Sequence, residues 1–372
     1  MKRRQFIKSA AVLGAGSLAL AACGKEEEKK AKAPAVMKGK RELKMVTTWP
    51  KNFPGLGTGA QRLADSITAM TEGRLTVKLY AAGELVPPFE SFDAVSSGTA
   101  DMYHSAEYYW QGKSKAFNFF TAVPFGFTAN EIDAWLNYGG GQELWDELAA
   151  GFNIKSFAAG NTGVQMGGWF NKEINTPEDY KGLKIRMPGL GGEVLRRIGA
   201  AAVTLPGGEI FPSLQSGAID ATEWVGPWND LAFGFYKVTK FYYWPGFHEP
   251  GSTLSCGINK GVWDGLSSED KAIVQHACAA ENNRMFSEFN AKNGDALDTL
   301  INKHGVQLRK FSDEIMTTIG NASGEVMAEV GATDPLTTKI YDSYRGFRTK
   351  ALGWTELSET GYTSAQIGRA HV

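Results

Sequence analysis

Strand-like and helix-like segments alternate along residues 43–104 of the chain. Residues 57–71 are a clear helical example, because Leu63, Ile67 and Met70 fall on one face. Regular alternation of this kind favours an α/β fold with a largely parallel sheet. The expected elements are strands at 43–49, 75–80 and 101–104 and helices at 57–71 and 89–97.

A second unit of the same kind is expected to begin near Gly160. Along residues 183–188, apolar positions alternate with Lys184 and Arg186, which places the two basic side chains on the polar face of a strand. We interpret Gly189–Gly192 as a flexible strand-to-helix turn. The expected elements are strands at 164–170, 183–188, 203–205 and 219–224 and helices beginning at 175, 193 and 210.

From about Tyr242 the chain is expected to return to the first unit, with a strand at 254–259. A long helix should begin at Ser267, which has the character of a helix cap and is followed by acids in the first turn. Further helices are expected at 297–304, 312–330 and 337–353. A body of about 330 residues suits two lobes better than a single core. The expected division is 42–159 for the first part of lobe 1, 160–245 for lobe 2, and 246–366 for the return to lobe 1 and the C-terminal helices.

The first residues of the chain have the features of an export signal. A twin-arginine pattern, Arg3-Arg4, precedes an apolar run over residues 10–22, which is shorter than the roughly 20 residues of a membrane-spanning helix. Leu-Ala-Ala-Cys23 resembles the motif at which bacterial lipoproteins are cut and lipidated on cysteine. We therefore expect a Tat-type lipoprotein signal over 1–23, a disordered tether over 24–41, and a periplasmic protein held to a membrane by a lipid on Cys23. A plain cleavage site is the alternative.

Charge and cysteine content narrow the class of partner. The formal net charge is -1 and no basic block lies outside the signal, so nucleic acid is not expected as a partner. Besides Cys23, the cysteines are Cys256 and Cys278, which could form a disulfide in an oxidising compartment or remain two buried thiols.

The last residues, 367–372, match the translation of a widely used sequencing adapter. We expect them to be an artefact of the gene model, and we leave His371 out of functional reasoning. A longer open reading frame in the source genome would support this expectation.

The sequence offers little for catalysis, because it has no histidine pair with metal-binding spacing, no nucleophile elbow and no phosphate loop. Three charged residues stand out in apolar surroundings: Arg186, Glu223 and Glu249. An arginine at the end of a strand can hold a carboxylate with two parallel hydrogen bonds, or it can belong to an internal ion pair. Buried carboxylates must be paired, protonated or bound to a metal. The residues alone leave these interpretations open.

Two segments carry a resemblance to a known family. Residues 175–188 read NTPEDYKGLKIRMP, and residues 214–221 read LQSGAIDA. Both resemble signature segments of the DctP-like solute-binding proteins of TRAP (tripartite ATP-independent periplasmic) transporters. The resemblance covers nearly all of the chain after the tether. It implies a two-lobed fold like that of periplasmic binding proteins, with a hinge and long C-terminal helices.

The spacing of the charged residues is similar to that in the branch of this family that binds 2-oxo and 2-hydroxy monocarboxylates with a metal ion. The resemblance implies that Arg186 clamps the substrate carboxylate and that Gln165 offers its amide oxygen to ion and substrate. Glu223 would supply a carboxylate, Trp224 its main-chain carbonyl, and Glu249 would complete the ion's ligands. It also implies a wall on lobe 1 made by His104, Ser105 and Tyr108.

Oxygen ligands of this kind suit a hard cation such as Na⁺ or Ca²⁺. One arginine, two glutamates and a monocarboxylate sum to -2, which mildly favours Ca²⁺ because uncompensated buried charge is costly.

The resemblance further implies capture of a small carboxylate by closure of the two lobes, followed by delivery to the membrane subunits of a TRAP transporter. Relatives dimerise through their C-terminal helices, so a homodimer is a further expectation. A larger or dicarboxylic ligand, an exported metal-dependent lyase and a structural lipoprotein are the alternatives.

Overall fold

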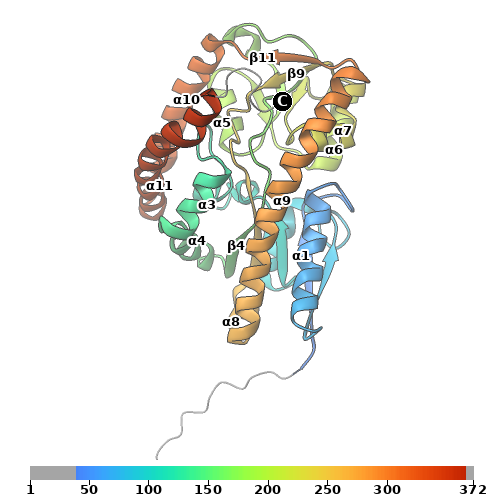
Figure 1. Cartoon of the computed structure of the whole chain (residues 1–372), viewed down its shortest axis with the longest axis vertical. Coiled ribbons are helices and arrows are strands. Elements are labelled where there is room, and N and C mark those ends of the chain that lie inside the picture. Colours follow the sequence, from blue (N-terminus) through green and yellow to red (C-terminus); the bar gives the residue numbers. More distant parts are fainter. Residues whose placement is uncertain (1–38, 366–372) are drawn as a thin grey trace, which may run out of the picture. The chain divides into compact units, whose positions relative to one another are not determined.

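The computed structural model describes residues 39–365, which form two β-sheets with helices packed around them (Figure 1). The signal with Cys23, nearly all of the expected tether and residues 367–372 lie outside this range. Arg41 already pairs with Leu75 in the first sheet, so the tether ends earlier than expected from the sequence. None of the described helices combines the length and the apolar character needed to cross a membrane.

The first sheet has five strands and defines lobe 1. Its order is β2 (Leu75–Tyr80), β1 (Arg41–Thr47), β3 (Met102–Ser105), β10 (Thr253–Asn259) and β4 (Ile154–Asn161). Strands β2, β1 and β3 are parallel, whereas β10 is antiparallel to both of its neighbours. The late strand β10 therefore lies inside this sheet and not at its edge.

The second sheet has six strands and defines lobe 2. Its order is β11 (Gln307–Lys310), β9 (Phe241–Trp244), β5 (Gly168–Phe170), β8 (Ala221–Thr222), β6 (Lys184–Arg186) and β7 (Ala201–Val203). Strand β5 is antiparallel to β8 and β9, and the remaining pairs are parallel.

Both sheets are therefore mixed, and the expectation of a largely parallel sheet is wrong. Strands that enter a sheet from the other lobe, such as β5 and β10, account for the antiparallel pairs. Two crossover segments, 162–167 and 245–252, join the lobes between these strands, and hydrogen bonds link the two segments to each other. Most of the strand expected at 164–170 is therefore crossover, and only its last residues belong to β5.

The chain after residue 246 is divided between the lobes and does not simply return to lobe 1. β10 belongs to the first sheet, but β11 joins the second sheet beside β9. Helix α10 (Asp313–Gly331) packs on α5 (Gly189–Arg197) of lobe 2, whereas α11 (Pro335–Thr355) packs on α3 (Ala129–Tyr138) and α4 (Gly141–Ala150).

Helix α9 (Ser268–Asn302) is the longest element, and 35 residues correspond to a length of about 50 Å. The hydroxyl of Ser267 accepts a hydrogen bond from the main-chain N–H of Asp270, so the expected cap is confirmed. The helix runs without a break through residue 302 and contacts α1 (Leu56–Met70), β4 and α7 (Pro227–Phe233), so it touches both lobes (Figure 1).

The glycine-rich segment Gly189–Gly192 forms the first turn of α5, and the interpretation as a flexible turn is wrong. A Cβ atom at Gly192 would lie 2.3 Å from the main-chain oxygen of Met187. Glycine therefore lets this helix begin immediately after β6, in close contact with the preceding loop.

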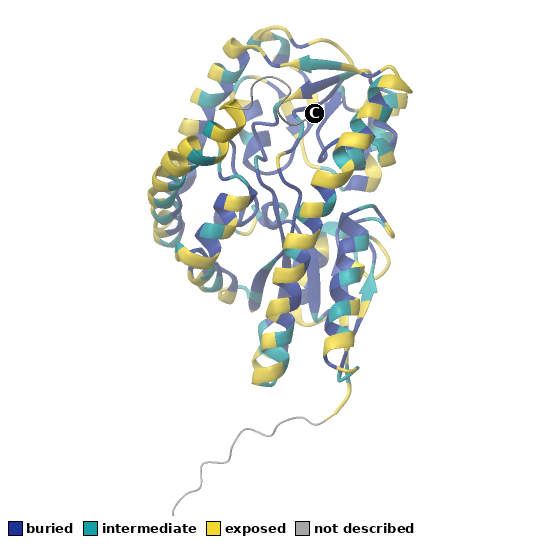
Figure 2. Cartoon of the chain, viewed as in Figure 1, coloured by how far each residue is buried: buried dark blue, intermediate teal, exposed yellow. Residues whose placement is uncertain are grey.

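The remaining helical segments are short. These segments are η1 (Pro88–Glu90), α2 (Ser91–Ser97), η2 (Glu107–Trp110), η3 (Lys115–Phe120), η4 (Pro177–Tyr180), α6 (Gly207–Gln215), η5 (Phe235–Lys237), α8 (Lys260–Asp264), η6 (Glu356–Thr360) and α12 (Gly361–Ala365). The inner strands and the inward helix faces are mostly buried, whereas the outer helix faces and the edge strand β11 are partly or fully exposed (Figure 2).

The two cysteines of lobe 1 are not joined in a disulfide. Cys256 and Cys278 are free, buried thiols within one apolar cluster.

Candidate functional site

Arg186 and Glu223 lie at the carboxyl ends of two neighbouring parallel strands. Arg186 is the last residue of β6, Glu223 follows β8, and the N–H of Glu223 donates to the carbonyl of Arg186 at 3.2 Å. The ends of parallel strands at one sheet edge are a common place for ligand sites in α/β proteins. Both side chains are about 1% exposed and form an ion pair through Arg186 Nη1 and Glu223 Oε1.

The guanidinium of Arg186 is surrounded by acceptors from the chain itself. Nε donates to the carbonyl of Leu205 at 3.2 Å, Nη1 to the carbonyl of Glu223 at 3.1 Å, and Nη2 to the hydroxyl of Tyr109 at 3.3 Å. The indole of Trp224 lies 5.1 Å from the guanidinium carbon. Burial opposes the charge, but Glu223, Tyr109, Tyr108 and Glu249 together outweigh it and raise the pKa of Arg186.

His248 holds the other oxygen of Glu223, because its Nε2 lies 3.2 Å from Oε2. Burial lowers the pKa of His248, but the hydrogen bond to Glu223 and the negative charges of Glu223 and Glu249 together raise it above its usual value. Reasoning from sequence missed this residue, although it stands directly before Glu249. A protonated His248 would add a positive charge that the sequence-based count omitted, which removes the electrostatic preference for Ca²⁺ over Na⁺.

Gln165 and Glu249 come from the two crossover segments and meet beside this pair. The Nε2 of Gln165 donates to Glu249 Oε2 at 2.8 Å and to Thr162 Oγ1 at 3.0 Å. The amide oxygen of Gln165 is buried and has no partner among the described residues. Burial and repulsion from Glu223 raise the pKa of Glu249 to about 7.

A small cavity of about 10 Å³ lies next to these groups. Tyr108, Tyr109 and Trp49 line it from lobe 1, and Gln165 and Trp224 line it from the crossover and lobe 2. The cavity therefore collects side chains from both lobes around a largely aromatic wall, together with Leu56, Thr162, Val225, Ser252 and Leu254.

His104 and Ser105 do not line this cavity, whereas Tyr108 does. Trp49 Nε1 donates to His104 Nδ1 at 2.9 Å, and His104 Nε2 lies 3.1 Å from the carbonyl of Ala159. Burial lowers the pKa of His104 to about 4, so the ring is neutral and both nitrogens are engaged internally. The hydroxyl groups of Ser105 and Thr48 form a hydrogen bond of 2.9 Å. Tyr109, the neighbour of Tyr108, and Trp49 are wall residues of lobe 1 that reasoning from sequence missed.

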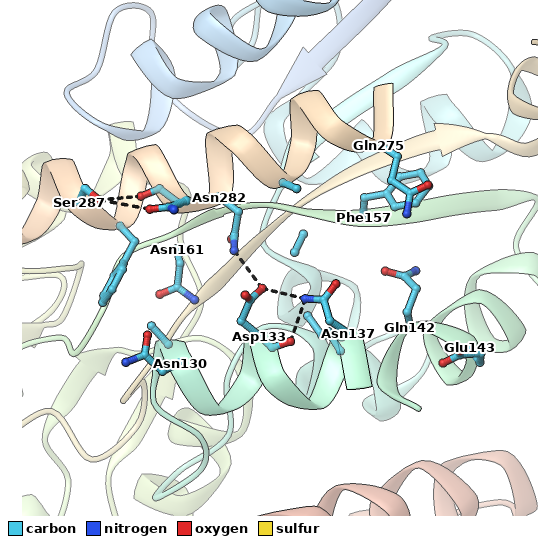
Figure 3. A pocket seen from close by; sticks show the side chains of 16 residues that line it. Asn130, Asp133, Asn137, Gln142, Glu143, Phe157, Asn161, Gln275, Asn282 and Ser287 are labelled. Atoms are coloured by element: carbon cyan, nitrogen blue, oxygen red, sulfur yellow. Dashed lines mark hydrogen bonds between the residues drawn. The ribbon is translucent and has the colours of Figure 1, made fainter. Parts of the chain in front are cut away.

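A larger hollow of about 620 Å³ lies elsewhere, between α9, α3, α4 and β4 (Figure 3). Amide side chains line it, and Asp133 at its centre accepts hydrogen bonds from Asn137 at 3.2 Å and Asn282 at 3.3 Å. Asp133 and Glu143 are its only charged side chains among the described residues, and both are acidic. Among the described residues, this hollow therefore offers no positively charged side chain to pair with the carboxylate of a ligand.

The residues around Glu223 fit a hard cation. Glu223, His248 and Glu249 each place one potential ligand atom within 4.8 Å of the others, and all three are buried. The unpartnered oxygen of Gln165 is a further donor for such an ion. Carboxylate and amide oxygens are the ligands that Na⁺ and Ca²⁺ favour.

Comparison with known proteins defines the class. The family of bacterial extracellular solute-binding proteins, family 7, matches residues 45–334, and the chain belongs to this family. A monocarboxylate 2-oxoacid-binding periplasmic protein from Nostoc sp. is 41% identical over 97% of this chain and 98% of its own length. The family consists of solute-binding receptors, so the protein is not an enzyme and the lyase alternative is set aside.

Two crystal structures extend the comparison. A TRAP periplasmic solute-binding protein from Pseudoalteromonas atlantica, with bound sodium and pyruvate, is 40% identical, with a TM-score of 0.86 over 88% of this chain and all of the other. A TRAP transporter solute-binding protein from Bordetella bronchiseptica, a dimer with calcium and picolinate in one site, is 35% identical, with a TM-score of 0.87 over 90% of this chain and all of the other. These structures confirm the two-lobed fold expected from the sequence.

Proposed function

We propose that this protein captures a short 2-oxo or 2-hydroxy monocarboxylate together with Na⁺ or Ca²⁺ and delivers it to the membrane subunits of a TRAP transporter. The observation that carries the proposal is a buried arginine at a strand end beside the buried carboxylates of Glu223 and Glu249 and the unpartnered amide oxygen of Gln165. The ligands of the related proteins support it, since pyruvate and picolinate both carry a carboxylate next to a second donor atom. A carboxylate can bind the guanidinium, while the second donor reaches the cation.

In this proposal each residue has a distinct task. Arg186 holds the carboxylate, and Tyr109 helps to orient the guanidinium through their 3.3 Å contact. Glu223, Glu249, the amide oxygen of Gln165 and the main-chain carbonyl of Trp224 would hold the cation, which supplies positive charge to the 2-oxo or 2-hydroxy oxygen. His104 and Ser105 would support the wall through Trp49 and Thr48 and not by direct contact.

Calorimetric titration of the mature protein with pyruvate, lactate, longer 2-oxo acids and succinate tests the proposal, each with CaCl₂, with NaCl, and with chelator in sodium-free buffer. Pyruvate and lactate should bind and be recovered unchanged. Their binding should also raise the melting temperature of the protein. The aromatic side chains of Trp49, Tyr108, Tyr109 and Trp224 crowd this region, so longer acids should bind more weakly than pyruvate. Failure of every acid to bind in the presence of either ion would refute the proposal.

Arg186 offers a variant pair for the same assay. Arg186→Ala should abolish binding, whereas Arg186→Lys should keep the charge but weaken binding because lysine cannot form two parallel hydrogen bonds. Arg309→Ala is the matched control, since Arg309 is a surface arginine paired with Glu173 at 2.7 Å. Wild-type affinity in Arg186→Ala would contradict the assigned role.

Export and anchoring form a further part of the proposal. Tat export and a lipid on Cys23 would keep the receptor beside the transporter and raise its effective concentration there. Cell fractionation tests this: Cys23→Ser should move the protein from the membrane to the periplasmic fraction, and lysine substitution of Arg3 and Arg4 should block export. An unchanged distribution would contradict it.

The C-terminal helices support a proposal of homodimer formation. Trp354, Leu357 and Tyr362 are 71%, 78% and 61% exposed, and they lie close together in sequence along the end of α11, η6 and α12. The dimeric crystal form of the Bordetella relative is consistent with a second copy covering this surface. Light scattering should show a dimer that Trp354→Glu converts to a monomer.

A further inference from the structure

Arg186 has too few free N–H groups to clamp a carboxylate in the arrangement described. Four hydrogen bonds engage its nitrogens, to Leu205, to Tyr109 and twice to Glu223. A guanidinium has five N–H groups, so one remains. Two parallel hydrogen bonds to a ligand require two. An internal acceptor must therefore leave before the ligand is clamped.

The acceptor best suited to leave is the side-chain carboxylate of Glu223. The carbonyls of Leu205 and Glu223 belong to the main chain, and the N–H of Glu223 is itself bonded to Arg186. The 3.3 Å contact with Tyr109 is the longest, but its loss would free only the two N–H groups of Nη2, whereas two parallel hydrogen bonds need N–H groups on two different nitrogens. The Glu223 carboxylate has the same charge and geometry as the ligand's own carboxylate, so it is a direct competitor for the guanidinium.

The carboxylate of Glu223 also has other partners close by. Its Oε2 is held by His248 at 3.2 Å, while its Oε1 faces Arg186. The same carboxylate belongs to the cluster with His248 and Glu249 that fits a cation. One oxygen can remain at His248 while the carboxylate turns its other oxygen from the arginine towards that cluster.

We propose that Glu223 is an internal competitor that covers Arg186 until a cation binds, so that cation binding makes the arginine available to the acid. This inference rests on the proposed function and adds an order of events to it. Cation and acid then bind with positive coupling, and each raises the affinity of the other by the same factor.

A cation that merely bridges protein and ligand would also couple the two affinities. The two mechanisms differ for the acid alone. If Glu223 competes, its removal should strengthen cation-free binding of the acid. If the cation only bridges, removal of Glu223 should bring no more than the general benefit of losing one negative charge near an anion.

Glu223→Gln and Glu249→Gln separate these effects. Both substitutions remove one buried carboxylate from the same cluster, but only Glu223 is bonded to Arg186. We expect both variants to bind Ca²⁺ more weakly than wild type. In chelator, we expect Glu223→Gln to bind pyruvate at least about tenfold more tightly than Glu249→Gln does.

Isothermal titration calorimetry with pyruvate, in sodium-free buffer with EDTA and in sodium-free buffer with CaCl₂, measures these affinities in the full mature chain. Equal cation-free affinities in the two variants would overturn the proposal. Failure of wild type to bind pyruvate both in CaCl₂ and in NaCl would instead count against the proposed function.

A second measurement uses wild-type protein and does not depend on a variant folding. Side-chain ¹⁵N signals of Arg186, assigned by comparison with Arg186→Lys, report whether the guanidinium keeps a carboxylate partner. Addition of CaCl₂ without acid should shift these signals and speed rotation about the guanidinium bonds. Unchanged signals at saturating Ca²⁺ would also overturn the proposal.

Discussion

Single residues in this protein show how burial sets chemical state. Glu107 is fully buried in lobe 1, where Tyr103 donates to its Oε1 at 2.7 Å and its Oε2 has no partner among the described residues. Burial raises the pKa of Glu107 to about 7, from a usual value of 4.5. The folded protein therefore holds this proton more tightly than the unfolded chain does.

This difference predicts a pH dependence of stability. The contribution of Glu107 is complete below about pH 4.5 and is lost as the pH rises through 7, which amounts to about 3 kcal/mol. Glu107→Gln should reduce the fall in the free energy of unfolding between pH 5 and pH 8, as measured by urea denaturation. Glu147→Gln, at a surface pair with Lys339, is the control. An identical fall in wild type and Glu107→Gln would contradict the prediction.

Asp230 is a second buried acid, and it fixes the loop that carries Trp224. Trp169 Nε1 and the Tyr242 hydroxyl donate to its Oδ2 at 2.9 and 2.6 Å, and the N–H of Val225 lies 3.4 Å from its Oδ1. Each donor left unpaired in the interior costs about 1–3 kcal/mol.

Asp230→Ala should therefore lower the free energy of unfolding by about 3 kcal/mol or more, as measured by chemical denaturation. Pyruvate affinity should fall as well, because the loop beside Trp224 loses its anchor. Asp264→Ala removes an exposed partner of Lys260 and should cost less than about 1 kcal/mol. Equal effects of the two substitutions would contradict this assignment.

At the scale of elements, close packing in the first sheet gives a further prediction. Gly257 lies in β10 opposite Tyr103 of β3, and an added Cβ would lie 2.1 Å from Cζ of that ring. Gly257→Ala should lower the free energy of unfolding by about 1–3 kcal/mol, because the ring has to move in a packed interior.

Gly324→Ala in helix α10 is the matched control, since an added Cβ there meets no atom within 4 Å. Alanine is more stable in a helix than glycine by about 1 kcal/mol, so the melting temperature of this variant should equal or exceed that of wild type. Gly257→Ala with wild-type stability would show that Tyr103 adapts without cost.

Periodicity and caps allowed many of these elements to be predicted. α1, β2, β10 and the start of α9 follow from local signals, because apolar spacing and a serine cap act within a few residues. The strands β4, β9 and β11 were missed, because their pairing depends on partners far away in sequence.

The candidate site was predictable to a similar degree. Arg186, Glu223, Gln165 and Glu249 do converge, which followed from the family resemblance. His248 and Tyr109 carry no local signature that separates them from core residues. Contact between them and the charged cluster depends on the three-dimensional arrangement of the crossovers, which local patterns do not encode.

At the scale of the whole molecule, the site combines residues of both lobes, so ligand binding should favour a closed arrangement. Small-angle X-ray scattering should show a smaller radius of gyration with pyruvate and CaCl₂ than with chelator. Acetate, which lacks the second oxygen donor, is the ligand control, and Arg186→Ala should show no change with pyruvate. Equal radii in all samples would contradict closure on binding.

The interior position of β10 has a consequence for how the protein is made. β3 and β4 are both synthesised long before β10, yet each pairs with it in the finished sheet. The first lobe therefore cannot be completed until the ribosome has translated the entire six-stranded neighbour except β11. Neither half is encoded by an uninterrupted stretch of gene, so a nascent chain arrested before residue 253 carries an unfinished sheet.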